Sequence, residues 1–407
     1  MASLNLNGVG KVYLSGATAL YDINLEADDR EFIVIVGGEK SGKSSLLKII
    51  AGLEEASAGV VSIDGKDMSE VDPKNRDVAM VFRQDTLYPS LNVYDNMAFG
   101  LRMRHASQAL IDQRVKSAAN ILGLNEILYR KPKVLNSAAR QRVAIGRAMV
   151  REPKLYLLDE PLAGIDDSLR RDMLNVIINV QARMSGTFIY ATKNLSEALA
   201  IGTRIMVLKN GLVQQIDTPS NLYDYPANTY VAFYIGSPTI NFLQDAKVVK
   251  DGENYFAEFK GGRLPLSEST VARFTDIEEY AQSGKSIILG IRPEDIKTSS
   301  EGQLVAALMK TEADGDVEYA GCELDGQPLV VTFAERAEKG EEVKLSVDLT
   351  RLCVFDSETR LTLLKRDGGY MDTGKKDADR IPLPYPEEQA IIEKLKPKKE
   401  AAKKKLR

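Results

Sequence analysis

The sequence contains no tryptophan, two cysteines and one histidine in 407 residues. Two cysteines are too few for a disulfide framework, and they favour a reducing compartment. No run of apolar residues approaches the length of a membrane-spanning helix, and the first residues lack the basic-then-apolar layout of a signal peptide. We therefore expect a cytoplasmic protein that meets a membrane only through partner proteins.

The excess of negative over positive charge is also small. The formal net charge is −4, with 28% charged and 44% hydrophobic residues. This balance gives no global attraction to nucleic acid or to an anionic membrane, so we expect no nucleic-acid partner. The length of 407 residues is more than one hydrophobic core usually holds, and it predicts two domains.

Residues 1–235 alternate between apolar strands and helical segments. The run Phe32–Val36 is continuously apolar, as expected for a strand buried on both faces of a sheet. Similar strands are expected at Val78–Phe82, Leu155–Leu158, Thr187–Tyr190 and Ile205–Leu208. Helices are expected at 46–51, within 93–151 and at 167–184, with one apolar face made of Ile111, Val115, Ala118, Ala119 and Leu122. The alternation predicts an α/β domain with a largely parallel sheet.

The pattern changes after residue 235. Short strands separated by Gly, Asp, Asn and Ser turns, as at 248–252 and 255–262, predict a small β-barrel or sandwich. Proline and lysine are frequent in the last forty or so residues, where a flexible tail is expected. The predicted domains are therefore 1–235, 236–366 and a Pro/Lys-rich tail at 367–407.

A glycine-rich segment follows the first buried strand. Its sequence, Gly37-Gly38-Glu39-Lys40-Ser41-Gly42-Lys43-Ser44, has the spacing of a P-loop and lies between a strand and a helix, as that motif requires. Glycines let the backbone wrap a phosphate, and amide groups at the helix start supply positive potential. Lys43 is expected to reach the β- and γ-phosphates, and the Ser44 hydroxyl to bind Mg²⁺. The alternative is a plain glycine-rich turn, which the strand and helix on either side disfavour.

Two carboxylates, Asp159 and Glu160, end the apolar strand at Leu155–Leu158. Asp159 is placed to hold Mg²⁺ through water, and Glu160 to polarise the attacking water. Taken alone, two acids near a helix start are a common structural arrangement. Their combination with the P-loop favours the functional interpretation.

Ten further segments of the sequence carry a resemblance to one protein family. They are Met80–Phe82, Leu87–Pro89, Val93–Leu101, Arg140–Ala144, Arg151–Lys154, Asp159–Leu162, Ile235–Pro238, Asn241–Leu243, Gly290–Asp295 and Val354–Asp356. In these segments the chain resembles the ATP-binding subunits of ABC importers of the maltose and multiple-sugar type. The resemblance implies an α/β P-loop nucleotide-binding domain, with a parallel sheet core and a helical subdomain, followed by an all-β OB-like regulatory domain. It also implies ATP and Mg²⁺ as cofactors.

The resemblance assigns nucleotide contacts to particular residues. Tyr13 falls where the family stacks an aromatic ring on adenine, although it could be an ordinary strand tyrosine. The other ATP-binding positions are Gly37, Gly38, Glu39, Lys40, Ser41, Gly42, Lys43, Ser44 and Ser45. The implied Mg²⁺ ligands are Ser44, Asp159 and Gln84, although Gln84 stands one residue after the family's glutamine position.

The resemblance also implies partners. A second ATP-binding subunit is expected, in a homodimer or a heterodimer, docked under two transmembrane permease subunits at the cytoplasmic face of the cell membrane. An extracellular solute-binding protein would be met indirectly. Leu87, Tyr88 and Pro89 lie where such ATPases receive the membrane subunit, and a buried loop is the alternative.

Several positions depart from the family pattern. The Leu-Ser-Gly-Gly-Gln signature is replaced by Leu135-Asn136-Ser137-Ala138-Ala139, which puts side chains where a partner's γ-phosphate must come close. Lys193 replaces the switch histidine, and a lysine cannot act as a neutral acceptor. Arg83 stands in place of the Mg²⁺-sensing glutamine, and Gln84 follows it.

Two functions follow from this mixture. The first is an importer ATPase subunit whose hydrolysis is reduced or depends on a second, complete ATPase subunit, and Glu160 favours it because a scaffold needs no polarising base. The second is a non-hydrolysing, ATP-sensing regulatory or scaffold subunit, favoured by Lys193 and by Ala138-Ala139. ABC proteins of translation or DNA repair fit poorly, because this chain has a single P-loop and an OB-like region. In a heterodimer with a complete partner, we predict one weak or silent site.

Overall fold

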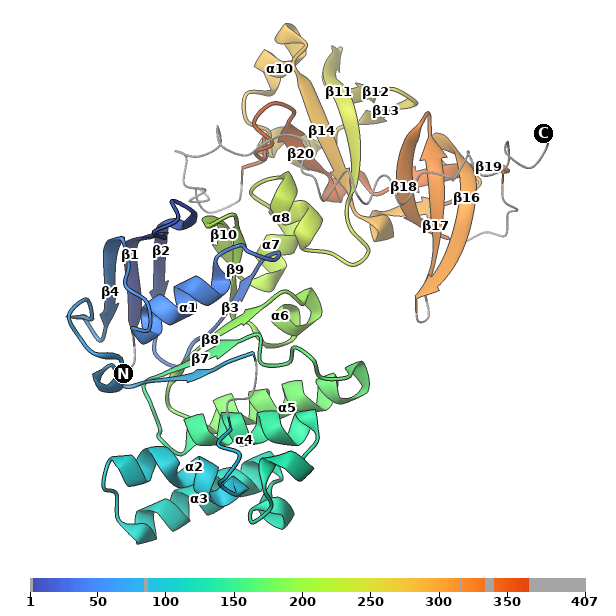
Figure 1. The fold of residues 1–407 in the computed structure, drawn as a ribbon. Coiled ribbons are helices and arrows are strands. Elements are labelled where there is room, and N and C mark those ends of the chain that lie inside the picture. The colour runs from blue at the N-terminus through green and yellow to red at the C-terminus, as the bar shows by residue number, and fades with distance from the viewer. Residues whose placement is uncertain (1–2, 84–86, 315–316, 334–339, 366–407) are drawn as a thin grey trace, which may run out of the picture. The chain divides into compact units, whose positions relative to one another are not determined.

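The computed structural model describes residues 3–83, 87–314, 317–333 and 340–365. The chain divides into two compact units, residues 1–219 and 220–407 (Figure 1). Gln84 and the tail expected at 367–407 lie outside the described residues. No helix in the described ranges is both long enough and apolar enough to cross a membrane.

A six-stranded sheet is the centre of the first unit. Its order is β10-β9-β3-β8-β7-β6, and every neighbouring pair is parallel except β9 and β10. The strands are β3 (Phe32–Val36), β6 (Val78–Val81), β7 (Leu155–Asp159), β8 (Thr187–Thr192), β9 (Arg204–Lys209) and β10 (Leu212–Asp217). Every residue of β3, β7 and β8 is buried, which explains their nearly continuous apolar sequences. The predicted parallel sheet is confirmed.

A second sheet of four antiparallel strands has the order β2-β1-β4-β5. Its strands are β1 (Leu4–Val12), β2 (Thr18–Ala27), β4 (Ala58–Ile63) and β5 (Lys66–Asp67). Helix α1 (Lys43–Ala51) begins within the P-loop and ends at Gly52, as predicted. Its apolar side chains share one buried cluster with both sheets, and Figure 1 shows α1 between them. Burial on two sides fixes the start of α1, where phosphate binding is expected.

Helices make up much of the rest of the first unit. They are α2 (Val93–Met103), α3 (Gln108–Leu122), α4 (Ser137–Met149), α5 (Asp167–Arg183) and α6 (Leu195–Ile201), with short 3-10 turns at Pro73–Asn75, Asn125–Ile127 and Pro132–Val134. The five apolar residues that the sequence placed on one face of α3 are all buried. At Gly146, a Cβ would press on Met97 of α2 and Leu122 of α3. The glycine therefore lets α4 pass close to both helices.

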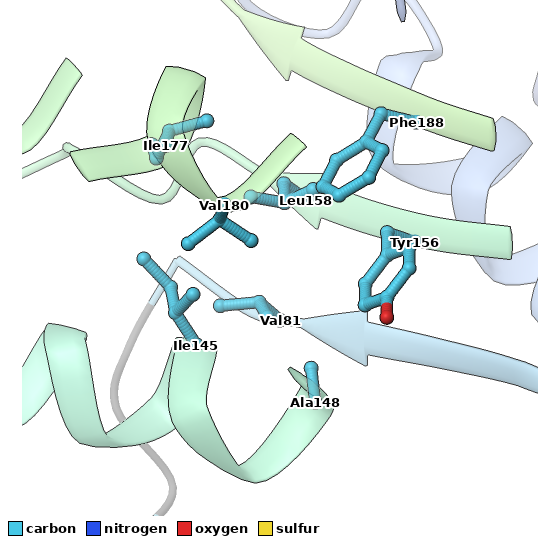
Figure 2. Close-up of a pocket in the computed structure, with 8 residues that line it drawn as sticks. All are labelled: Val81, Ile145, Ala148, Tyr156, Leu158, Ile177, Val180 and Phe188. Carbon is cyan, nitrogen blue, oxygen red and sulfur yellow. The ribbon is translucent and has the colours of Figure 1, made fainter. Parts of the chain in front are cut away.

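Apolar side chains from α4 and α5 pack against strands β6, β7 and β8 (Figure 2). The rings of Tyr156 and Phe188 stack with centroids 4.4 Å apart. The gap that remains has a volume of about 10 Å³ and is lined by Val81, Ile145, Ala148, Tyr156, Leu158, Ile177, Val180 and Phe188. Such a space is at the lower limit for a single water, so this region is core and not a ligand site.

The second unit is built mainly of strands. An antiparallel sheet has the order β13-β12-β11-β14-β20, and a closed barrel has the order β15-β18-β17-β16-β19. The sheet strands are β11 (Asn241–Asp251), β12 (Asn254–Phe259), β13 (Gly262–Pro265), β14 (Ser286–Ile291) and β20 (Cys353–Asp356). The barrel strands are β15 (Ile296–Thr298), β16 (Leu304–Asp314), β17 (Val317–Leu324), β18 (Gln327–Thr332) and β19 (Glu342–Val347). The predicted β domain is confirmed.

Helices also belong to this second unit. They are α7 (Pro219–Asp224), α8 (Thr229–Tyr234), α9 (Glu268–Arg273) and α10 (Ile277–Ser283), with 3-10 turns at Pro293–Asp295 and Leu349–Arg351. The sequence placed residues 220–235 in the first domain, whereas they lie in the second compact unit. Arg292 explains this, because its guanidinium donates to the carbonyl oxygens of Ala232 and Ile235 at 2.9 and 2.6 Å. The domain boundary at residue 235 stays a prediction.

Candidate nucleotide-binding site

Four segments of the predicted site follow neighbouring strands of the six-stranded sheet. The P-loop follows β3, Lys193 follows β8, Glu160 follows β7, and Arg83 comes shortly after β6. Carboxyl ends of parallel strands lie along one edge of a sheet, which is where α/β proteins bind ligands. The strand order β3-β8-β7-β6 therefore places these residues along the same edge.

The P-loop backbone requires glycine at two positions. A Cβ at Gly37 would overlap the carbonyl oxygen of Leu208. A Cβ at Gly42 would lie 2.5 Å from the carbonyl oxygen of Ala19, and the φ of 106° at Gly42 also favours glycine. Lys40, in the same loop, adopts a φ of 60°, which a non-glycine residue tolerates at some cost. The loop conformation is thus dictated by close backbone approaches.

Lys43 is buried within the P-loop, with 5% of its surface exposed. Its ammonium group donates to the carbonyl oxygens of Gly37 and Gly38, at 2.8 Å each, and to Ser41 Oγ at 3.2 Å. Burial lowers the pKa of Lys43, and the nearby carboxylates of Glu160 and Asp159 oppose this change. The loop holds a cation on its own carbonyl groups, and phosphate oxygens can replace these acceptors.

Ser44 and Asp159 meet at the start of α1 and the end of β7. The Ser44 hydroxyl donates to Asp159 Oδ1 at 2.8 Å. Burial raises the pKa of Asp159, and the hydrogen bond from Ser44 acts in the opposite direction. A hydroxyl and a carboxylate fit Mg²⁺, which takes few protein ligands and completes its shell with water and phosphate oxygens. In the described part of the chain, no cluster of three or more His, Cys, Asp or Glu side chains offers another metal site.

Glu160 faces an arginine. Arg83 NH1 lies 3.5 Å from Glu160 Oε2, and no described residue hydrogen-bonds to that oxygen. The Glu160 backbone N–H donates to the carbonyl oxygen of Ala191 at 2.8 Å, which anchors the residue beside β8. The group expected to polarise water is thus next to a cation. The sequence identified Arg83 as a replacement for glutamine but gave no signal for this pairing.

Lys193 follows β8 and pairs with a residue of the P-loop. Its Nζ is 3.5 Å from Glu39 Oε1, and both side chains are largely exposed. An exposed ion pair of this kind contributes little to stability. The positive charge of Lys193 also lowers the pKa of Lys43, which places Lys193 within electrostatic reach of the phosphate-binding group.

A buried carboxylate lies behind the end of β8. Glu197, 3% exposed, accepts hydrogen bonds from the hydroxyls of Tyr190 and Thr192 at 2.8 and 2.7 Å. Arg170 NH1 lies 3.5 Å from Glu197 Oε1, and Arg170 NH2 donates to the carbonyl oxygen of Ile165 at 3.2 Å. Glu197 therefore connects β8 to α5 and to the loop before α5. Sequence reasoning missed it, because an acid in a short helix carries no distinguishing pattern.

Tyr13 lies beside the start of α1. Its hydroxyl is 2.8 Å from Ser45 Oγ and donates to Glu54 Oε2 at 2.9 Å. The ring is 37% exposed, with the ammonium of Lys11 at 5.2 Å from its centroid. These contacts hold a partly open aromatic ring next to the P-loop helix, where a base could stack on it.

The altered signature lies at the start of α4. The hydrogen bond that caps this helix is made within the signature itself. Asn136 is the N-cap, and its Oδ1 accepts from the backbone N–H of Ala139 at 2.8 Å. Asparagine caps a helix as well as serine does, so this replacement preserves the helix start. Ala138 is buried, with 5% exposed. The side chain of Asn136 is thus engaged with its own helix.

The predicted partner patch at Leu87, Tyr88 and Pro89 is not a buried loop, since Tyr88 and Pro89 are exposed. Asn96, 0% exposed, accepts from the Tyr88 N–H at 2.8 Å and donates to the Tyr88 carbonyl oxygen at 3.1 Å. The Tyr88 ring packs on Phe99, with centroids 4.5 Å apart. Asn96 and Phe99 therefore position Tyr88, a role that only the folded structure makes visible.

Two family profiles match the sequence: ABC transporter over residues 20–163 and MalK OB fold domain over residues 236–296. The Bacillus subtilis oligosaccharides import ATP-binding protein MsmX is 40% identical over 372 residues, covering 89% of this chain and 100% of that protein. The chain belongs to the ABC transporter family. It is an ATP-binding subunit of the importer type that carries a MalK-like OB domain.

Other relatives of this ABC subunit are similar over almost their whole length. The trehalose/maltose import ATP-binding protein MalK of Thermococcus litoralis is 39% identical over 375 residues, covering 88% of this chain and 99% of that protein. The uncharacterized ABC transporter ATP-binding protein YcjV of Escherichia coli K12 is 41% identical over 367 residues, covering 89% of this chain and 100% of that protein.

A solved structure agrees with the fold. The ABC transporter component cbiO1 of Clostridium perfringens is 27% identical and superposes with a TM-score of 0.51, covering 54% of this chain and 89% of that chain. The expected ABC fold is therefore confirmed.

Proposed function

We propose that the chain powers the uptake of a carbohydrate or related solute as the ATP-binding subunit of an importer. The support is the similarity to proteins named for oligosaccharide and for trehalose/maltose import, together with the match to the MalK OB fold domain. It acts at the cytoplasmic face of the cell membrane, with two permease subunits and a second ATP-binding subunit. A solute-binding protein on the outside is reached through the permease. A purely scaffolding role is not favoured by these relatives.

The observation that carries nucleotide binding is the buried Lys43 beside the Ser44–Asp159 pair. Lys43 exchanges its carbonyl acceptors for phosphate oxygens, and the Tyr13 ring stacks on the adenine. Ser44 and Asp159 would hold Mg²⁺, which would supply positive charge next to the phosphates. The residues that grip the nucleotide are therefore all present in this chain.

We further propose that hydrolysis at this P-loop is slow in the lone chain. Arg83 occupies the carboxylate of Glu160, and Lys193 cannot accept a proton or a hydrogen bond as a neutral histidine can. Removal of one well-placed transition-state donor costs about 10²–10³ in rate. A partner lacking its signature glycines would add to this loss, so two copies of this chain form two weak sites.

Pairing with a second ATP-binding subunit whose motifs are complete would restore hydrolysis at only one of the two nucleotide sites. One composite site joins this chain's P-loop and Glu160 to an intact partner signature. The other joins the partner's P-loop to this chain's altered signature, in which the side chains of Ser137 and Ala138 stand where glycine permits close approach to phosphate. We propose an asymmetric pair with one active site and one that binds ATP without efficient turnover.

The test measures ATP binding and ATP hydrolysis on the same preparations. We expect the purified chain to bind ATP and to hydrolyse it slowly, and the assembled transporter with a complete ATP-binding subunit to turn over at one site per pair. Brisk hydrolysis by the lone chain would overturn the proposed asymmetry. Absence of ATP binding would overturn the proposed function itself.

We propose that Leu87, Tyr88 and Pro89 contact a permease subunit. The exposed Tyr88 ring, fixed by Asn96 and Phe99, offers an apolar surface of defined position. Tyr88→Ala is expected to weaken co-purification with the permease subunits while ATP binding stays intact. Tyr21→Ala is the matched control, because Tyr21 is similarly exposed, on β2. Equal co-purification of both variants would contradict this assignment.

A further inference from the structure

The second unit contains a polar cavity of about 270 Å³ that the nucleotide site does not use. Side chains of α7, α9, the turn after β14 and the 3-10 turn before β20 line it. The side chains that make the cavity polar and charged are mainly Tyr223, Tyr225, Arg273, Arg292, Asp295 and Arg351. The volume is just below the ~300 Å³ at which small-molecule pockets begin, so the cavity has room for a small metabolite.

Two arginines of the cavity lie over tyrosine rings. The guanidinium carbon of Arg292 is 4.0 Å from the Tyr223 ring centroid, and that of Arg273 is 4.8 Å from the Tyr225 centroid. A guanidinium held on an aromatic ring has little freedom left to lose when its edge binds a ligand. The cavity therefore presents two oriented cations.

The hydrogen-bonding edge of Arg273 is open. Its Nε donates to the carbonyl oxygen of Lys365 at 3.0 Å, and no described residue accepts from its two terminal nitrogens. Arg292 uses its terminal nitrogens on backbone carbonyl groups, whereas its buried Nε has no partner within the described ranges. Neither arginine forms an ion pair with a carboxylate that the structure describes.

The third arginine is already neutralised. Arg351 lies 3.3 Å from Asp224 and 3.4 Å from Asp295. Three arginines and two aspartates line the cavity, which leaves one surplus positive charge. Burial raises the pKa of Asp295 to about 6, so its negative charge is held less firmly than that of an exposed aspartate. Both features favour an anionic ligand.

We propose that this cavity binds a small phosphate-bearing metabolite, with the open edge of Arg273 as the main contact to the phosphate. Two parallel N–H groups of a guanidinium match two oxygens of one phosphate. The two arginines without carboxylate partners suit the nearly doubled charge of a phosphate monoester better than the single charge of a carboxylate. Asp224 and Asp295 remain as acceptors for hydroxyl groups on the rest of the ligand.

The test is a calorimetric titration of the full chain. Because the P-loop also binds phosphate, the titration uses the Lys43→Ala variant as its background. Inorganic phosphate and glucose 6-phosphate are the two probes, and glucose is the uncharged control. We expect saturable binding of at least one phosphate compound, weakened about tenfold or more by an added Arg273→Gln, since charged hydrogen bonds contribute about 1.5–3 kcal/mol. No binding of either probe, or binding that Arg273→Gln leaves unchanged, overturns the proposal.

Two further variants keep the result interpretable. Arg263→Gln is the matched control, because its guanidinium lies 3.7 Å from the Phe256 ring in the same unit but outside the cavity lining, and it should not change binding. Arg273→Lys keeps the charge and loses the fork, so it replaces Arg273→Gln if that variant does not fold, with weaker binding again expected. ATP binding by the wild-type chain is measured separately, so failure of this proposal leaves the nucleotide site untouched.

Discussion

The two halves of the nucleotide site are held in different ways. The phosphate-binding half depends on close backbone approaches at Gly37 and on buried bonds of Lys43 and Ser44. The half expected to act on the γ-phosphate depends on long side chains at strand ends, such as Arg83 and Lys193, which reach their partners at 3.5 Å. The first half retains the family pattern, and the second half departs from it.

This difference shows where an ABC subunit can change without losing its fold. A substitution at Gly37 would force backbone atoms apart, so the residue is fixed by the fold as well as by function. Arg83 and Lys193 are 58% and 51% exposed, and their exchange for other side chains disturbs little packing. The side chains near the γ-phosphate position can therefore be replaced while the P-loop keeps its conformation.

The largest expected effect is on the binding half. Lys43→Ala should weaken ATP binding about 100-fold or more, because loss of a charged partner of phosphate costs about 2–5 kcal/mol. Equilibrium binding of labelled ATP measures the change. Lys66→Ala is the control, since Lys66 is an exposed lysine on β5 outside the P-loop, and it should stay near wild-type affinity. Similar affinities for the two variants would break the distinction between the halves.

The adenine contact comes next in size. Tyr13→Ala should weaken ATP binding about tenfold, because aromatic stacking on a base contributes about 1–3 kcal/mol. Tyr13→Phe keeps the ring and loses only the hydroxyl contacts to Ser45 and Glu54, so its affinity should stay close to that of the wild type. A loss in Tyr13→Phe as large as that in Tyr13→Ala would show that the hydroxyl, and not the ring, matters.

A smaller effect is expected on the hydrolytic half. Arg83→Gln frees Glu160 from its ion pair, and a 3.5 Å pair whose arginine is exposed is worth up to about 1 kcal/mol, or about fivefold in rate. ATP turnover by the assembled transporter with a complete partner subunit should rise by that factor. Arg102→Gln, which breaks a pair with Asp95 at 2.8 Å in α2, should not change it. Unchanged or lower turnover in Arg83→Gln would contradict the inhibitory role.

The smallest effect concerns stability and pH. Burial raises the pKa of Asp159, so the folded chain favours the protonated carboxyl. The free energy of unfolding therefore falls as the pH rises from the pKa of an unfolded aspartate through the raised pKa of Asp159. Asp159→Asn should therefore raise the melting temperature of the nucleotide-free chain at pH 7.5. The expected rise is roughly 2–4 °C for each kcal/mol gained in the free energy of unfolding. The gain should shrink at acidic pH. A gain that is equal at both pH values would show that burial of the charge is not the cause.

Local patterns predicted the strands and the helix that carry the binding half. The continuous apolar run at Phe32–Val36, the spacing up to Ser44 and the acids after Leu155–Leu158 all lie within short stretches of sequence, and the structure joins them through adjacent parallel strands. Parallel strands align their carboxyl ends, so the fold class alone brings Ser44 close to Asp159. The hydrogen bond between these two residues agrees with that expectation.

The remaining features arise from contacts between distant segments. The approach of Arg83 to Glu160 depends on the path of the chain after β6, and the capping of the Tyr88 loop by Asn96 depends on the position of α2. No periodicity or spacing encodes either contact. The compact units divide after Pro219, whereas the sequence placed the domain boundary at residue 235, and Arg292 binds the carbonyl oxygens of Ala232 and Ile235 across 60 and 57 positions of sequence.

The buried Glu197 connects a strand, a helix and a loop of the first unit. One carboxylate joins Thr192 at the end of β8 to Arg170 of α5, and the same arginine grips the carbonyl oxygen of Ile165. Displacement of the loop at Ile165 would therefore be coupled through Arg170 and Glu197 to Thr192, the residue that precedes Lys193.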